Sequence, residues 1–233
     1  MGHKKLIKFK AIETFANVIQ YPKNTCNTWY DFFKNQNPIC LELACGKGEY
    51  SVGLGRVNKN QNFIGVDIKG NRIYTGAKIA LEEQLNNVAF IRGQIDHLDE
   101  YFGAQEVNEI WIVFSDPFLK KPKNRLTHPR FLSIYQKVLK PNSLIHLKTD
   151  SLELYEFTLE TIAEQECQIV ENIADIYGKS KAIGPLAIQT FYEKMHLAEG
   201  RTIYYLSFRL PATAIRIPEK NKAFLFDHES PSE

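Results

Sequence analysis

The 233-residue sequence has little cysteine and no long hydrophobic run. Its four cysteines, Cys26, Cys40, Cys45 and Cys167, form no C-x-x-C pair and are too sparse for a secreted disulfide scaffold, so we expect reduced thiols. No stretch approaches the roughly 18 apolar residues of a membrane span, and the charged N-terminus lacks the apolar segment of a signal peptide. The sequence therefore predicts a soluble cytoplasmic protein with no membrane partner.

The chain also has little net charge and no recognisable metal-binding motif. The net charge of +2 and the pI of about 8.2 are too mild to indicate nucleic-acid binding, so such a function has to rest on local clusters of cations. The six histidines show no H-x-x-x-H or Cys/His grouping, which argues against a metal site. A hydrophobic content of 44% suffices for one sizeable core. We expect a basic lead-in over residues 1–37, one domain over 38–210 and a tail over 211–233.

Short apolar runs alternate with helix-length amphipathic stretches along the chain. This alternation predicts an α/β fold with a mostly parallel sheet. The last two runs have no comparable helix between them, so we expect an antiparallel pair at the end of the sheet. The expected strands are 39–44, 62–67, 88–92, 109–115, 143–149, 168–177 and 201–210, and the expected helices include 71–84, 129–139 and 153–164.

The first of these strands carries an acid and runs into a glycine turn. Glu42 lies in an apolar strand, where an unpaired carboxylate is costly, so it should face a partner, and a ligand in a cleft is one candidate. Gly46 and Gly48 then open a helix, which is how an α/β sheet brings its backbone close to a nucleoside. A plain strand–helix turn is the alternative. Ser51 stands where the third glycine of a dinucleotide fingerprint belongs, which disfavours NAD.

The next two strands also end on polar side chains. Asp67, at the end of the second strand, could accept both hydroxyl hydrogens of an adenosine ribose, or it could cap the following helix. Gln94 follows the third strand and could reach an adenine edge, although a surface position is as good an interpretation. These residues together suggest that the sheet binds a nucleoside at the carboxyl ends of its strands.

The fourth strand ends on Asp116 and continues into a basic loop. Pro117 ends the strand by removing a backbone donor. Residues 118–130 contain no acid but several cations, so the loop could hold phosphates, although a solvated connection is the alternative. The cations are Lys120, Lys121, Lys123, Arg125 and Arg130. A carboxylate beside such a loop suggests chemistry on a nucleic acid.

This ordered set of acids and glycines resembles class I S-adenosylmethionine-dependent methyltransferases, and the later motifs resemble the bacterial tRNA (guanine-N7) methyltransferase family. Those motifs are Leu126 with Phe131-Leu132, Leu139-Lys140-Pro141, Leu147-Lys148-Thr149-Asp150, and Thr190-Phe191-Tyr192-Glu193 with Gly200 and Ile203. The resemblance covers roughly residues 38 to 208. It implies a Rossmann-like class I methyltransferase fold: a mostly parallel seven-stranded sheet with an antiparallel C-terminal strand and helices on both faces.

The resemblance also implies a reaction and its residues. A methyl group would pass from S-adenosylmethionine to N7 of a guanine in tRNA, that of the variable loop at position 46. Neither a monomer nor a homodimer is favoured. Cofactor contacts are implied at Glu42, Gly46, Gly48, Asp67, Gln94 and Asp116, catalysis at Asp116, and contacts with tRNA or guanine at Lys120, Asp150, Thr190, Phe191, Tyr192 and Glu193.

The chemistry of guanine N7 suits this set of residues. N7 has a free lone pair, so transfer requires in-line placement rather than a strong base. Positive charge appears on the purine as the methyl group moves, and a fixed carboxylate beside the base would stabilise it. Asp116 or Asp150 could do so while accepting hydrogen bonds from guanine N1–H and N2–H, and Glu193 is a third carboxylate with the same capacity.

Several residues depart from the family's pattern. Ala44 replaces the usual first glycine of the cofactor turn, a small change if its φ is negative. Gln94 stands where Asp or Asn is common, and Ser115, Phe118 and Met195 replace Pro, Trp and Lys. The stretch 122–125 replaces a longer basic run, so tRNA binding could depend more on the lysines of the lead-in, Lys4, Lys5, Lys8 and Lys10.

Two alternatives stay open. The segment Ser115-Asp116-Pro117-Phe118 faintly resembles the D/N-P-P-Y/F element of adenine-N6 and related nucleic-acid amino-methyltransferases, although the second proline is missing. The departures at Ala44 and Gln94 also leave open a non-catalytic α/β module that binds RNA or nucleotides.

Overall fold

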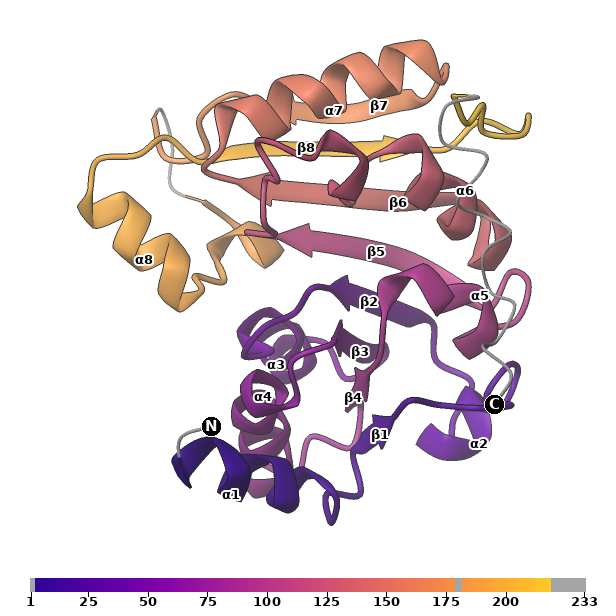
Figure 1. The fold of residues 1–233 in the computed structure, drawn as a ribbon, viewed down its shortest axis with the longest axis vertical. Coiled ribbons are helices and arrows are strands. Elements are labelled where there is room, and N and C mark those ends of the chain that lie inside the picture. The colour runs from indigo at the N-terminus through magenta and orange to yellow at the C-terminus, as the bar shows by residue number, and fades with distance from the viewer. Residues whose placement is uncertain (1–2, 179–181, 219–233) are drawn as a thin grey trace, which may run out of the picture.

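One sheet organises the chain in the computed structural model, which describes residues 3–178 and 182–218 (Figure 1). Its strands are β1 (Val18–Gln20), β2 (Ile39–Leu43), β3 (Asn62–Asp67), β4 (Val88–Arg92), β5 (Val107–Val113), β6 (Leu139–Thr149), β7 (Gln168–Ile173) and β8 (Tyr204–Arg209). They are ordered β1-β4-β3-β2-β5-β6-β8-β7. β8 runs antiparallel to both β6 and β7, and all other neighbouring strands are parallel.

Helices cover both faces of the sheet. They are α1 (His3–Ile12), α2 (Trp29–Phe33), α3 (Glu49–Val57), α4 (Gly70–Glu82), α5 (Leu98–Tyr101), α6 (Pro129–Val138), α7 (Leu152–Glu164) and α8 (Phe191–Ala198). One apolar core contains side chains of α2, α5, α6 and α7, and the other contains side chains of α3 and α4. The molecule is therefore built in three layers around the sheet.

The residues of β2 show how the sheet divides these two cores. Ile39, Leu41 and Leu43 belong to the core beneath α5 and α6, whereas Cys40 belongs to the core beneath α3 and α4. Successive side chains of a strand point to opposite faces, and both faces are covered here, so the strand is apolar almost throughout. Glu42 shares the face of Cys40 and is the one acid in this run.

The expected α/β class and the antiparallel pair at the end of the sheet are confirmed, but the sheet has eight strands where seven were expected. The additional strand, β1, pairs with β4 from within the lead-in. It is three half-buried residues long, too short to show an alternating pattern. The lead-in also supplies Trp29, whose indole N–H donates to the carbonyl of Tyr101 at 2.9 Å within the core.

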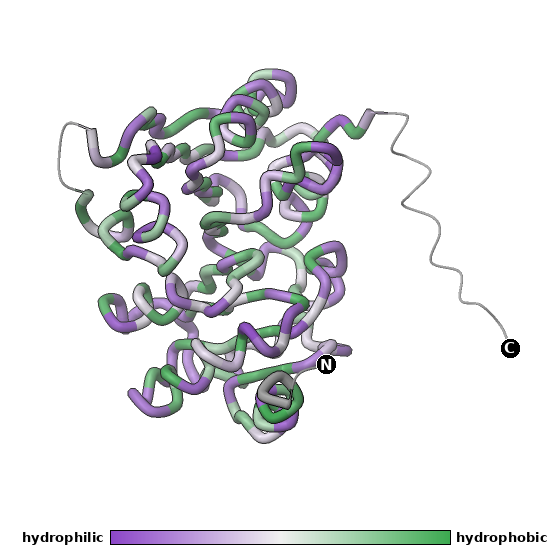
Figure 2. Tube along the Cα trace, turned by 60° about the vertical axis from the view of Figure 1, so that its left-hand side comes forward, coloured by the Kyte–Doolittle hydropathy of each residue, from purple (hydrophilic) through white to green (hydrophobic). Residues whose placement is uncertain are grey.

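The distribution of hydrophobic residues and the extent of the described chain bear on two further expectations. Hydrophobic and hydrophilic residues are interspersed along the tube in Figure 2, and no helix of the described residues is long and apolar enough to cross a membrane. The side chains of Lys4 and Lys5, and the tail beyond residue 218, lie outside the described part of the chain.

Candidate functional site

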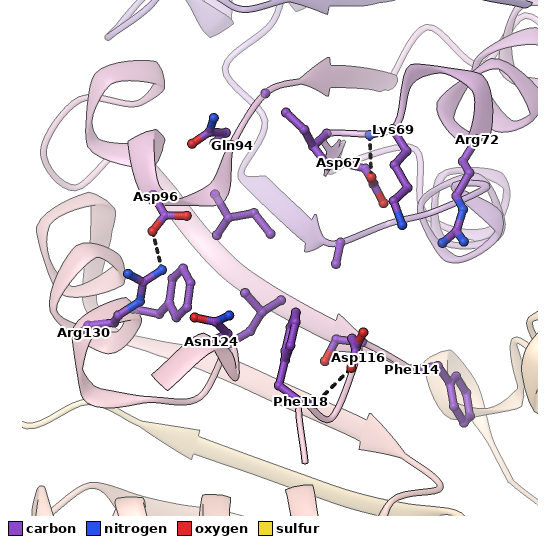
Figure 3. A pocket seen from close by; sticks show the side chains of 17 residues that line it. Asp67, Lys69, Arg72, Gln94, Asp96, Phe114, Asp116, Phe118, Asn124 and Arg130 are labelled. Atoms are coloured by element: carbon purple, nitrogen blue, oxygen red, sulfur yellow. Dashed lines mark hydrogen bonds and ion pairs between the residues drawn. The ribbon is translucent and has the colours of Figure 1, made fainter. Parts of the chain in front are cut away.

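A cavity of about 620 Å³ lies where β2, β3, β4 and β5 end. Parallel strands present their carboxyl ends at one edge of a sheet, and ligands of open α/β sheets bind there. Figure 3 shows Asp67, Gln94 and Asp116 around this cavity, so the fold brings together three of the predicted site residues. The other polar and aromatic residues that line it are Lys69, Arg72, Asp96, Phe114, Ser115, Phe118, Asn124, Arg130 and Phe131.

Asp67 is the polar centre of the cavity's β3 side. Its side chain is buried, with one oxygen accepting the Gly46 N–H at 2.9 Å and the other accepting the Lys69 N–H at 2.7 Å. Each carboxylate oxygen has further acceptor capacity, so Asp67 can hold the glycine turn and still accept two hydroxyl groups from the cavity. The interpretation as a plain helix cap is too narrow, since one of its partners belongs to the turn after β2.

The turn after β2 requires left-handed backbone. Gly48 has φ +67°, and a Cβ there would lie 2.3 Å from Cε1 of Phe90, so a larger residue is excluded by packing. Gly46 has φ +55° with open space where its Cβ would be. Ala44 lines the cavity at φ +54°, so the condition under which its replacement of glycine would be a small change is not met.

Glu42 has the partner that its burial demands, and this partner is a residue of the chain. Its carboxylate, only 4% exposed, accepts hydrogen bonds from the N–H and the hydroxyl of Ser51, in the first turn of α3. Burial raises the pKa of Glu42 to about 7, against the lowering effect of the Ser51 hydrogen bonds. Glu42 does not line the cavity, so contact with a cofactor stays a prediction. Ser51, which breaks the dinucleotide fingerprint, thus has a structural role that the sequence pattern did not suggest.

Gln94 is exposed at the end of β4, on the wall opposite Asp67 in Figure 3. It follows Gly93, where a Cβ would lie 2.6 Å from the Tyr101 hydroxyl. On the same wall, Arg130 pairs with Asp96. Neither Asp96 nor Arg130 was predicted to line this cavity, because Asp96 follows β4 whereas Arg130 lies in the first turn of α6, and only the fold brings these segments together.

Asp116 lies on a strained loop between two cavities. Its carboxylate is exposed and accepts the Phe118 N–H at 2.9 Å. Phe114 and Phe118, on either side of it, have φ +48° and +42°, conformations that bulky residues rarely adopt and that concentrate at functional sites. A second cavity of about 510 Å³ shares Arg72, Phe114, Ser115 and Asp116 with the first. Asp116 therefore faces both spaces.

The second cavity contains several residues predicted to contact the substrate. Asp150, which follows β6, accepts a hydrogen bond from Arg201 at 2.8 Å, and its carboxylate lies 3.5 Å from Nε2 of His196. Tyr192 and His196 of α8 also line this cavity, and their rings stack with centroids 6.4 Å apart. His196 was missed because no motif in the sequence singled it out.

The Thr190–Glu193 element divides into structural and exposed residues. The Thr190 hydroxyl and the Glu193 carboxylate form the capping box that begins α8. Glu193 is fully buried against Lys148, with Oε1 2.6 Å from Nζ. Its carboxylate was predicted to contact the substrate, but in the structure it does not line the cavity. Phe191 and Tyr192 are 52% and 40% exposed, which leaves them accessible to a substrate.

The basic loop is less basic at its surface than its sequence suggested. Arg125 is buried, donates to the carbonyl of Pro117 at 2.8 Å and lies over the ring of Phe157. Arg130 forms the ion pair with Asp96. These two residues hold the loop in place, and Lys120, Lys121 and Lys123 remain exposed.

The sheet order, the antiparallel β8 and a cavity at the carboxyl edge define a Rossmann-like class I methyltransferase fold. A solved structure of the 16S rRNA methyltransferase KamB has this fold, with a TM-score of 0.62 over 84% of this chain and 99% of that chain, at 13% identity. A family model described as a putative methyltransferase matches residues 36–206.

Proteins named tRNA (guanine-N(7)-)-methyltransferase are similar over nearly the whole chain. One from Bacteroides thetaiotaomicron is 42% identical over 224 residues, which are 92% of this chain and 89% of that protein. One from Christiangramia forsetii is 47% identical over 223 residues, which are 90% of this chain and 100% of that protein. The chain belongs to the tRNA (guanine-N(7)-)-methyltransferase family, as its motifs predicted.

Proposed function

We propose that this chain transfers a methyl group from S-adenosylmethionine to N7 of a guanine in tRNA, giving 7-methylguanosine and S-adenosylhomocysteine. The observation that carries the proposal is the position of Asp116, which lines two adjoining cavities of sizes suited to a cofactor and a base. A group-transfer enzyme needs two such spaces that meet at one point. The variable-loop guanine is the target that the family resemblance suggests.

The first cavity suits the adenosine part of the cofactor. Asp67 would accept the two ribose hydroxyls, because its oxygens retain acceptor capacity beside the two backbone amides that they hold. Gln94 would offer its amide to the adenine edge. The open space beside Gly46 and the apolar side chains of Ile68 and Ile95 fit a ligand that is part polar and part apolar.

The second cavity suits a guanine. Asp116 and Asp150 both line it, and a carboxylate can accept the N1–H and N2–H of guanine together, a pair of donors that adenine lacks. Arg201 and His196 hold Asp150 from one side. The exposed rings of Tyr192 and Phe191 would stack on the target base or its neighbour.

The reaction then requires orientation more than proton transfer. When bound, S-adenosylmethionine supplies an electrophilic methyl group on a positively charged sulfur. Asp116 would stabilise the positive charge that develops on the purine, and a base is not needed because N7 loses no proton. The strained backbone at Phe114 and Phe118 fixes where this carboxylate lies.

The tRNA body would be held by exposed cations. Lys120, Lys121 and Lys123 lie on the loop next to Asp116. Lys69 and Arg72 line the cofactor cavity, and Arg72 also lines the second cavity. Lysine contacts with phosphates would give a salt-dependent affinity without base specificity. A tRNA substrate is consistent with the cytoplasmic location that the sequence predicts.

Incubation with methyl-labelled S-adenosylmethionine and unmodified bulk tRNA, followed by nucleoside analysis, tests the proposal. We expect the label in 7-methylguanosine. Label in 6-methyladenosine, or in no RNA product, would contradict it. Calorimetry with S-adenosylmethionine alone separates the two failures, since a non-catalytic module whose cofactor pocket has become structural would show no binding at millimolar cofactor.

A further inference from the structure

A fully buried ion pair joins the sheet to α8. Nζ of Lys148, in β6, lies 2.6 Å from Oε1 of Glu193, and both side chains are 0% exposed. Burial lowers the pKa of Lys148, and the nearby Glu193 carboxylate opposes this effect. Such a pair contributes little net stability compared with packed apolar side chains, so its retention here calls for another reason.

All three donors of the Lys148 ammonium have partners in α8 or in the segment that leads into it. Besides Glu193, it donates to the carbonyl of Leu186 at 2.9 Å and to that of Ile188 at 3.2 Å. Glu193 in turn accepts the Tyr177 hydroxyl at 2.7 Å. This network ties Tyr177 and residues 186–193 to one point on β6.

The other contacts of α8 lie nearer the surface. Glu193 is the only buried residue among the eight of this helix, and Figure 1 shows the helix beyond the carboxyl ends of β5 and β6. Elsewhere along α8, the Phe191 N–H donates to Glu49 and its ring lies 4.2 Å from Nζ of Lys47. His196 pairs with Asp150, and the half-buried Leu197 packs against the core beneath α3 and α4. The pair with Lys148 is therefore the one fully buried ion pair of α8 among the described residues.

The same pair joins two elements, β6 and α8, whose neighbouring residues line the second cavity. Lys148 is two residues before Asp150 on β6, whereas Glu193 adjoins Tyr192 and precedes His196 by one helical turn on α8. We propose that Lys148 and Glu193 are positioning residues, which hold α8 so that Tyr192 and His196 face Asp150 across the guanine cavity, and that Glu193 does not itself touch the substrate. This inference rests on the proposed function for the identity of the base.

Three variants separate positioning from direct contact: Lys148→Met, Glu193→Gln and the double variant. Gln at position 193 preserves the capping box and removes only the charge. Each single variant leaves one buried charge without its partner, and we expect kcat/KM for tRNA to fall at least tenfold while the Kd for S-adenosylmethionine changes less than threefold. The double variant leaves neither charge, and we expect kcat/KM within about threefold of wild type. Removing the carboxylate of the exposed Arg56–Glu83 pair by Glu83→Gln is the matched control, with no expected change.

A double variant that binds S-adenosylmethionine normally but is as inactive as Glu193→Gln would overturn the inference, since the carboxylate would then act on the substrate directly. Full activity of both single variants would overturn it as well.

Hydrogen exchange gives a readout that needs no substrate. In Glu193→Gln, amides of α8 should exchange at least tenfold faster than in wild type, whereas those of β3 and β4 should be unchanged. Unchanged protection of α8 would contradict the inference even if a variant were too unstable to assay. Failure of the wild-type chain to form 7-methylguanosine would instead contradict the proposed function, and the exchange comparison would still test the positioning of α8.

Discussion

Replacing Glu42 by Gln should remove a pH-dependent loss of stability. The pKa of this carboxyl is raised from 4.5 to about 7, chiefly because it is buried. A carboxyl whose pKa is higher in the folded than in the unfolded chain binds more protons when folded, so its stabilising contribution is present below about pH 4.5 and is lost as the pH rises through 7. The two values differ by about 2.5, and at about 1.4 kcal/mol per pKa unit the full loss is about 3 kcal/mol.

Urea unfolding of wild type and Glu42→Gln between pH 4.5 and 8 measures this loss. Other titratable groups are common to both proteins, so the difference between their free energies of unfolding isolates Glu42. We expect this difference to shift by about 3 kcal/mol in favour of the Gln variant from pH 4.5 to pH 8. A difference constant to within about 0.5 kcal/mol, or a shift in the opposite direction, would refute the account of Glu42 as a desolvated acid held by Ser51.

Three further predictions follow from the site. Ala44→Gly should raise the free energy of unfolding by roughly 0.5–1 kcal/mol, because φ is +54° there; an unchanged or lower melting temperature would contradict this. Asp116→Ala should lower methyl transfer at least ~100-fold while unfolding changes by less than about 1 kcal/mol, since its side chain is exposed and makes one hydrogen bond; an unimpaired variant would remove its catalytic role. Changing Lys120, Lys121 and Lys123 together to Ser should raise KM for tRNA and flatten its salt dependence by about 2 in the log–log slope, and equal slopes would exclude the loop from the interface.

The carboxyl edge of the sheet could be predicted from the sequence because its information is local. Each strand is an apolar run that ends on a polar residue, so Asp67, Gln94 and Asp116 could be assigned to one edge as soon as the sheet was taken to be parallel. The cavity that they share follows from this topology.

The rest depended on contacts between distant segments. No sequence motif around Glu42 indicates that Ser51 donates hydrogen bonds to its carboxylate. Likewise, none around Arg125 indicates that its guanidinium binds the Pro117 carbonyl and packs on the Phe157 ring. The sequence likewise presents Glu193 as a carboxylate without a partner, because Lys148 lies 45 residues earlier and only the packing of α8 against β6 brings the two together. β1 was not predicted, because a strand of three residues is too short to show an alternating hydrophobic pattern.

Methyl transfer to a tRNA transcript made with 7-deazaguanosine in place of guanosine tests the central claim most directly. This base keeps the N1–H and N2–H that the carboxylates would bind but has carbon where guanine has N7. We predict that the ordinary transcript is labelled by methyl-labelled S-adenosylmethionine and that the 7-deaza transcript is not. Equal labelling of the two transcripts would contradict transfer to guanine N7.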